Sequence, residues 1–204
     1  MRALPPIAAL LWPGLAMLLW PASAWADPRC ARFGQPSYTA TRVTSWGAAP
    51  PVTAQMFQAG PKLRLETPAP GEARLVTLMT PGLHAVFATN ASPPVALRMP
   101  PPPSPAARRE RQEAQRGGVL VIQEVQGESG QWHEVARHLC RRDGVLLEAR
   151  QLQPGPEGPM ILETRQSGIR MISADPTLFQ LPAGFRLIEA PAAPISRRTD
   201  RPPG

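Results

Sequence analysis

Lysine and tyrosine are almost missing from this chain of 204 residues, in which Lys62 is the one lysine among 22 basic residues and Tyr38 the one tyrosine. Against 15 acidic residues, the basic residues give a formal net charge of +7. The arginines are scattered, and their densest run, within 106–116, is interleaved with glutamates. This pattern does not predict a nucleic-acid-binding protein and is typical of a solvated surface. If a charged partner exists, anionic lipid headgroups at a membrane surface fit the pattern best.

The short motifs that mark common enzyme sites are also absent. The sequence contains no nucleophile elbow, phosphate-binding loop, dinucleotide fingerprint or zinc-protease helix. His133 and His138 are five residues apart. At this spacing two side chains lie on different sides of a helix and on opposite faces of a strand. The carboxylates are scattered as well. We therefore expect no catalytic residue, no metal site and no cofactor, and a protein that is not an enzyme.

Long uninterrupted apolar runs are missing too. The most apolar stretch, 7–20, is broken by Pro13 and Gly14, which disfavours a membrane anchor and favours a cleavable secretory signal over residues 1–26. Ala24-Trp25-Ala26 forms a small-x-small cleavage site, so the mature chain is expected to begin at Asp27. No lipobox precedes Cys30, and no lipid attachment is expected.

Cysteine is scarce, with only Cys30 and Cys140. In an exported chain an even pair of cysteines normally becomes oxidised, so we expect a Cys30–Cys140 disulfide. Two free or intermolecular thiols are the alternative. A haem attachment motif is absent.

Short strand-like segments dominate what is present. Alternating segments at 52–58 and 62–67 flank Ala59-Gly60-Pro61 and predict a hairpin, and further strands are predicted at 74–80 and 84–89, on either side of Pro81-Gly82. Turn residues every 8–12 positions indicate a mainly β protein built on an antiparallel sheet.

Proline breaks this rhythm in the middle of the chain. Residues 93–116 combine a proline-rich stretch with the charged segment 106–116, for which we expect a short exposed helix, and we interpret the whole as an inserted connection. The domain prediction is thus one β domain over 27–189, followed by a disordered Pro/Arg-rich tail over 190–204.

The segment 131–142 supports two interpretations. Trp132, Val135, Ala136, Leu139 and Cys140 follow a helical spacing. The Arg-Asp-Gly that follows is instead typical of a hairpin turn.

Two motifs resemble a known group. A Lys-x-Arg-x-Glu segment at 62–66 precedes a strand at 75–78 and a Met-Pro pair at 99–100, and the chain later reads Asp-Pro-Thr-Leu-Phe-Gln-Leu-Pro-Ala-Gly-Phe over 175–185. This order is similar to that of LolA-like periplasmic proteins, the outer-membrane lipoprotein carrier superfamily and its uncharacterised relatives. In the second motif we expect Leu178 and Phe179 to begin a strand.

The resemblance implies a curved antiparallel sheet, an incomplete barrel with a covering helix or loop, located in the periplasm. It also implies binding of a lipid or a lipoprotein acyl chain on an apolar concave face, so the candidate partners are a lipid, an acylated protein or a membrane surface. If the curved sheet forms, one face of each strand lines its interior. Plain core packing is the alternative role of the candidate ligand-binding residues, which are Leu63, Leu65, Val76, Leu78, Val86 and Phe87. The alternative function is an envelope scaffold that contacts partners through its Pro/Arg-rich segments.

Overall fold

The computed structural model describes residues 28–100, 108–155 and 158–190. These residues form one 12-stranded sheet in the order β12-β6-β5-β4-β3-β2-β1-β11-β10-β9-β8-β7. All neighbouring strands are antiparallel except β12 and β6, which are parallel. The predicted mainly β fold with an antiparallel sheet is confirmed. The strands are β1 (Ser37–Trp46), β2 (Val52–Ala59), β3 (Lys62–Pro68), β4 (Arg74–Thr80), β5 (Leu83–Ala88), β6 (Val95–Arg98), β7 (Arg108–Gln115), β8 (Gly118–Gln126), β9 (Trp132–Cys140), β10 (Leu146–Gly155), β11 (Gly158–Met171) and β12 (Arg186–Glu189).

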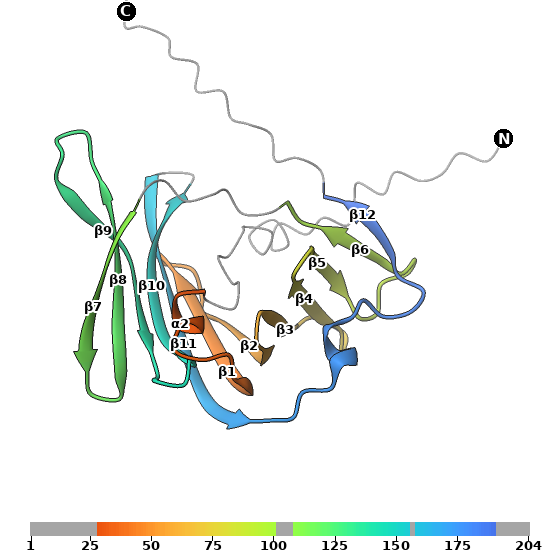
Figure 1. Cartoon of the computed structure of the whole chain (residues 1–204). Helices are drawn as coiled ribbons and strands as arrows, with labels where there is room; N and C mark the ends of the chain where they lie inside the picture. The colour runs from red at the N-terminus through yellow and green to blue at the C-terminus, as the bar shows by residue number, and fades with distance from the viewer. Residues whose placement is uncertain (1–27, 101–107, 156–157, 191–204) are drawn as a thin grey trace, which may run out of the picture.

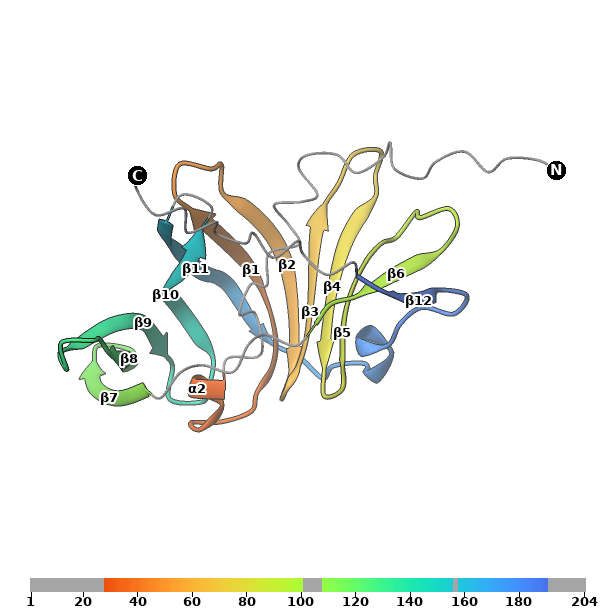
Figure 2. The same cartoon turned by 90° about the horizontal axis from the view of Figure 1, so that it is seen from above.

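The sheet is strongly curved and is not closed into a barrel (Figures 1 and 2). Its edge strands β7 and β12 lie on opposite sides of the molecule, and β1 lies near the middle. The short helix α2 (Pro28–Ala31) lies inside the bend (Figure 1). The structure is therefore an incomplete barrel, as the resemblance implied.

Two faces of the sheet follow from the strand registers, because residues opposite each other in a sheet share a face. We call the face that carries Tyr38 the concave face. It includes Cys140, whose disulfide to Cys30 holds α2 on this side. We call the face that carries Phe87 the outer face, and the short 3-10 helix η2 (Pro176–Phe179) packs there.

The predicted hairpin is present, and a second hairpin joins the strands predicted at 74–80 and 84–89. Strands β2 and β3 join through a turn at Gly60, which has φ of 54°, and β4 and β5 join through Gly82, with φ of 87°. A positive φ is strained for residues with a Cβ, which explains the glycines in both turns. The Gly-Pro and Pro-Gly turn residues in the sequence thus correctly predicted where these strands begin and end.

The expected helix at 106–116 is wrong. Residues 108–115 form the edge strand β7, paired along its length with β8. Its charged side chains suit an exposed sheet edge as well as an exposed helix. Strand β6 also lies inside the segment that we interpreted as an inserted connection.

The helical interpretation of 131–140 is wrong as well, and β9 occupies this segment between β8 and β10. The pairing shifts register where Gln123 opposes Ala136 and Glu124 opposes Glu134, which leaves Val135 as an extra residue. Such a bulge shifts the alternation by one position, so the apolar residues acquire a spacing close to that of a helix.

The predicted signal (1–26), the proline run (101–105) and the tail beyond Ala190 lie outside the described residues.

Candidate functional site

The six candidate ligand-binding residues fall on both faces of the sheet. Leu65 opposes Thr77 across β3 and β4, whereas Val76 opposes Glu66, so Leu65 and Val76 point to opposite sides. Continuing the registers gives two groups of three. Leu63, Leu65 and Val86 lie on the concave face. Val76, Leu78 and Phe87 lie on the outer face.

The concave face carries a continuous apolar cluster. Tyr38, Met56, Leu63 and Met79 from four neighbouring strands are at most 2% exposed, and they pack with Val145 from the β9–β10 turn. Partly buried side chains border this cluster, including Leu65 on β3. The cluster anchors the bend of the sheet, while its border presents apolar surface on the same face.

Several buried polar groups on the concave face are hydrogen-bonded to side chains. The hydroxyl of Tyr38 donates toward Gln58 at 3.0 Å and Gln166 at 3.2 Å, and burial raises the pKa of this phenol to about 12. Farther along the face, Nε2 of the fully buried His138 lies 2.9 Å from the amide nitrogen of Gln151. Tyr38 is therefore a neutral hydrogen-bonding residue of the core.

The outer-face group is covered by the end of the chain. Val76, Leu78 and Phe87 are at most 3% exposed and pack in one cluster with Phe179 of η2. The rings of Phe87 and Phe185 have centroids 5.0 Å apart. After β11 the chain crosses this face before β12 joins the sheet beside β6 (Figure 2).

The two motifs of the sequence analysis meet on the outer face. Nη1 of Arg64 donates to the carbonyl oxygen of Leu178 at 3.1 Å, and its Nε donates to Glu66 at 2.7 Å. Arg74 completes the group with a second ion pair to Glu66. Burial raises the pKa of Glu66, but hydrogen bonds from both arginines outweigh that effect, so its pKa lies below the usual value.

The expectation that Leu178 and Phe179 begin a strand is wrong, because both residues belong to η2. Asp175 caps η2 by accepting a hydrogen bond from the backbone N–H of Thr177 at 2.9 Å, and Pro176 occupies the first turn. The motif therefore builds a short helical turn that directs Phe179 into the outer-face cluster.

The predicted Cys30–Cys140 disulfide is present, and it links α2 to β9 across 110 residues. Both cysteines are at most 1% exposed, and they pack with Val121, Leu146 and Ala149. The disulfide thus fixes the N-terminal segment on the concave face.

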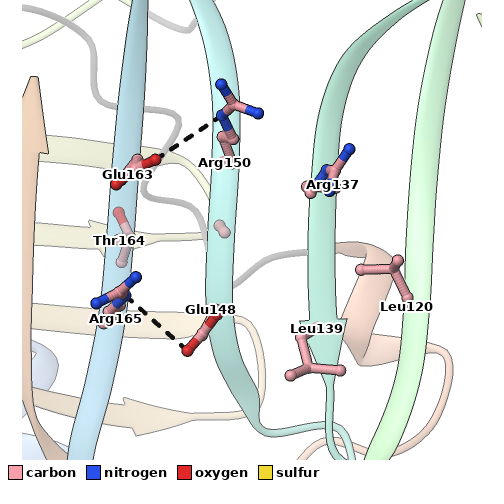
Figure 3. A pocket seen from close by; sticks show the side chains of 9 residues that line it. Leu120, Arg137, Leu139, Glu148, Arg150, Glu163, Thr164 and Arg165 are labelled. Atoms are coloured by element: carbon pink, nitrogen blue, oxygen red, sulfur yellow. Dashed lines mark ion pairs between the residues drawn. The ribbon is translucent and has the colours of Figure 1, made fainter. Parts of the chain in front are cut away.

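A shallow depression of about 130 Å³ lies on the outer face of β8–β11, and sequence reasoning missed it (Figure 3). Two cross-strand ion pairs border it: Arg150 with Glu163 at 3.8 Å, and Arg165 with Glu148 at 3.9 Å. Alternation of charge along β10 and β11 was the available signal, but the register that pairs these residues becomes known only from the fold. The depression is lined by Leu120, Arg137, Leu139, Glu148, Ala149, Arg150, Glu163, Thr164 and Arg165.

Within the described ranges, His, Cys, Asp and Glu side chains form no group of three that could hold a metal ion. Among the helices of the same ranges, none is long and apolar enough to cross a bilayer.

No family model and no curated protein matches the chain. Among solved structures, the chain is similar to a LolA superfamily protein from Nitrosomonas europaea, with 12% identity and a TM-score of 0.40 over 78% of this chain and 98% of that chain. It is also similar to a DUF1329 family protein from Desulfovibrio piger, with 11% identity and a TM-score of 0.38 over 76% of this chain and 94% of that chain. These similarities concern the arrangement of the strands. They carry no information about a ligand.

Proposed function

We propose that this chain is an exported, non-enzymatic periplasmic protein that binds an apolar ligand, of the lipid or lipoprotein acyl-chain class, on its concave face. The apolar border of the concave cluster is the observation that carries this proposal. Leu65, Leu147 and Ile169 remain only partly buried while they pack against fully buried neighbours. An acyl chain laid along this border would bury that remaining apolar surface.

The energetics favour such a ligand. Burying one methylene group contributes about 0.8 kcal/mol, so ten methylenes contribute about 8 kcal/mol before the cost of ordering is subtracted. A gain of about 8 kcal/mol corresponds to a dissociation constant of about 1 μM, and the ordering cost weakens the affinity from that value. Because burial drives the binding, salt should change the affinity little.

We assign the ligand to the half of the candidate residues that lies on the concave face, namely Leu63, Leu65 and Val86. Leu65 is the best probe of the three, because its side chain is partly exposed while Leu63 is 1% exposed and Val86 8% exposed. Val76, Leu78 and Phe87 pack under the C-terminal segment, and we assign them to the core of the outer face.

The test is titration of an environment-sensitive fatty-acyl probe into the exported protein at low and high salt. Wild type should bind saturably at both salt concentrations, and Leu65→Gln should weaken binding about tenfold. Leu187→Gln is the matched control, since Leu187 is also partly buried but packs on the outer face. Absence of saturable binding, or an equal loss in both variants, would contradict the proposal.

Export is tested separately by the intact mass of protein secreted from a host that expresses the full chain. We expect an unacylated chain beginning at Asp27. A retained segment 1–26 or a diacylglycerol adduct would contradict this processing.

The charged depression on the outer face favours a second candidate function, an envelope scaffold that contacts another protein. Organic extracts of the protein, purified from a native-like envelope, distinguish the two by mass spectrometry. A stoichiometric co-purified lipid supports the carrier, whereas lipid-free protein in a stable complex with another chain supports the scaffold.

A further inference from the structure

One end of the sheet carries an unbalanced set of positive charges. The β7–β8 turn with Arg116, the β9–β10 turn with Arg141 and Arg142, and the last residues of β11 with Arg170 lie together at this end (Figure 1). The registers agree, because Val119 pairs with Cys140 at the β9–β10 turn, and Glu148 near the start of β10 pairs with Arg165 near the end of β11. We call this the Arg142 end.

Three of these arginines are available to a partner. Arg116, Arg142 and Arg170 are exposed, and no ion pair joins them to another residue of the described ranges. Arg141 is different, since it makes two hydrogen bonds to Asp143, at 2.9 and 2.6 Å, and is neutralised by that carboxylate.

The opposite end of the sheet has acidic turns, although it also includes Arg186 at the start of β12. Its described turns at 69–73 and 127–131 carry Glu72 and Glu128 and contain no lysine or arginine. The outer face between the two ends is balanced, because Arg137, Arg150 and Arg165 are each paired with a glutamate. Of the exposed arginines in the described ranges that no ion pair joins to another residue, three are thus gathered at the Arg142 end, and Arg186 lies at the other end.

An exposed apolar side chain lies among the arginines. Met171 is 56% exposed, and its sulfur lies 3.7 Å from a guanidinium nitrogen of Arg141. Neighbouring strands are about 4.8 Å apart, so the arginines from the β7–β8 turn to β11 extend over roughly 20 Å along one end of the sheet. A row of this kind suits an extended anionic surface better than a single small anion.

We propose that the Arg142 end is a membrane-contact surface, in which Arg116, Arg142 and Arg170 bind the phosphates of anionic lipids and Met171 enters the headgroup layer. Arginine is suited to phosphate because its guanidinium donates several hydrogen bonds in a fixed plane. Each basic residue near an anionic bilayer adds to the affinity, and salt screens the attraction. This surface is separate from the concave face, so the proposal does not depend on the ligand proposed above.

The test is sedimentation of the exported protein with large unilamellar vesicles of phosphatidylcholine that contain either 30% phosphatidylglycerol or none, at low and high salt. We expect binding to the anionic vesicles at low salt and much weaker binding at high salt or without phosphatidylglycerol. The triple variant Arg116→Gln, Arg142→Gln, Arg170→Gln should lose on the order of 100-fold in partition coefficient. Met171→Gln should lose several-fold.

The matched control is Arg137→Gln, Arg150→Gln, Arg165→Gln, which removes the same formal charge from exposed positions on the outer face. It should retain most of the binding, and far-UV circular dichroism should show that both triple variants fold. Equal losses in the two triple variants, or no binding of wild type to anionic vesicles, would overturn the proposal. Binding to soluble polyglutamate without binding to vesicles would assign the Arg142 end to an acidic protein and would also overturn it.

Discussion

Arg64 on β3 donates a hydrogen bond to the carbonyl oxygen of Leu178 in η2, although the two residues are 114 positions apart in the chain. Glu66 holds the same guanidinium from the other side at 2.7 Å. Through this contact one strand of the sheet fixes the segment that covers the outer-face cluster. The Lys-x-Arg-x-Glu and Asp-Pro-x-Leu-Phe motifs are thus two halves of one structural unit.

Arg64→Gln should destabilise the fold by about 2 kcal/mol, because it removes a largely buried charged hydrogen bond and leaves Glu66 with one partner fewer. Urea unfolding measures the change. Arg74→Gln is the control, since Arg74 pairs with the same carboxylate but its side chain is 59% exposed. We expect it to cost less than 1 kcal/mol. Equal costs for the two variants would show that the contact with Leu178 contributes nothing.

Gly144 should tolerate no side chain. A Cβ at this position would lie 2.0 Å from the carbonyl oxygen of Gly34, so the α2–β1 connection and the β9–β10 turn would have to separate. Gly144→Ala should therefore cost at least about 3 kcal/mol, measured by thermal or urea unfolding. Gly117 has the same φ of 93° but open space around it, so Gly117→Ala isolates the backbone strain at about 1–2 kcal/mol. A cost for Gly144→Ala no larger than for Gly117→Ala would contradict the close approach.

Stability should fall as the solution is acidified from pH 7 to pH 5. Burial lowers the pKa of His84 below its usual 6.5, and its buried Nδ1 has no hydrogen-bond partner among the described residues. The unfolded chain therefore binds the proton more readily, and acidification below about pH 6.5 favours unfolding. Glu66 acts in the same direction at lower pH, because its stabilising charge is lost as the pH falls through its lowered pKa.

His84→Gln should flatten the dependence between pH 7 and pH 5 in urea titrations at several pH values. His133→Gln, the same substitution at an exposed position, is the control. An unaltered slope in His84→Gln would contradict the assignment.

Removing the disulfide should cost about 4–5 kcal/mol in the chain-entropy description, because it closes a loop with a sequence separation of 110. The comparison is between wild type and the double variant Cys30→Ser, Cys140→Ser in urea. Alkylation of native, exported protein should label neither cysteine, and reduction in denaturant should expose both. Labelling of the native protein would contradict the linkage.

The sequence predicted the fold class because glycine turns such as Gly60 and Gly82 are local signals. It could not divide the candidate site between two faces, since whether Leu65 and Val76 share a face depends on the register across the β3–β4 turn. The helical interpretation of β9 was wrong for a similar reason, because the extra residue Val135 changes which positions of the strand share a face. The contact between Arg64 and Leu178 has no local signal at all. Long-range pairing determines these features.

The position of β1 has a consequence for how the chain is made. One side of β1 pairs with β2, the next strand to be synthesised, but the other side pairs with β11, and the Arg42–Thr164 contact between them joins residues 122 positions apart. The backbone groups on that second side can form their sheet hydrogen bonds only after β11, near the end of the chain, has been made. Closing so long a loop is slow, and an unpaired strand is prone to wrong pairing in the meantime. The middle of the finished sheet is therefore completed only after β11 has been made, and a chain truncated before β11 should aggregate rather than form a smaller sheet.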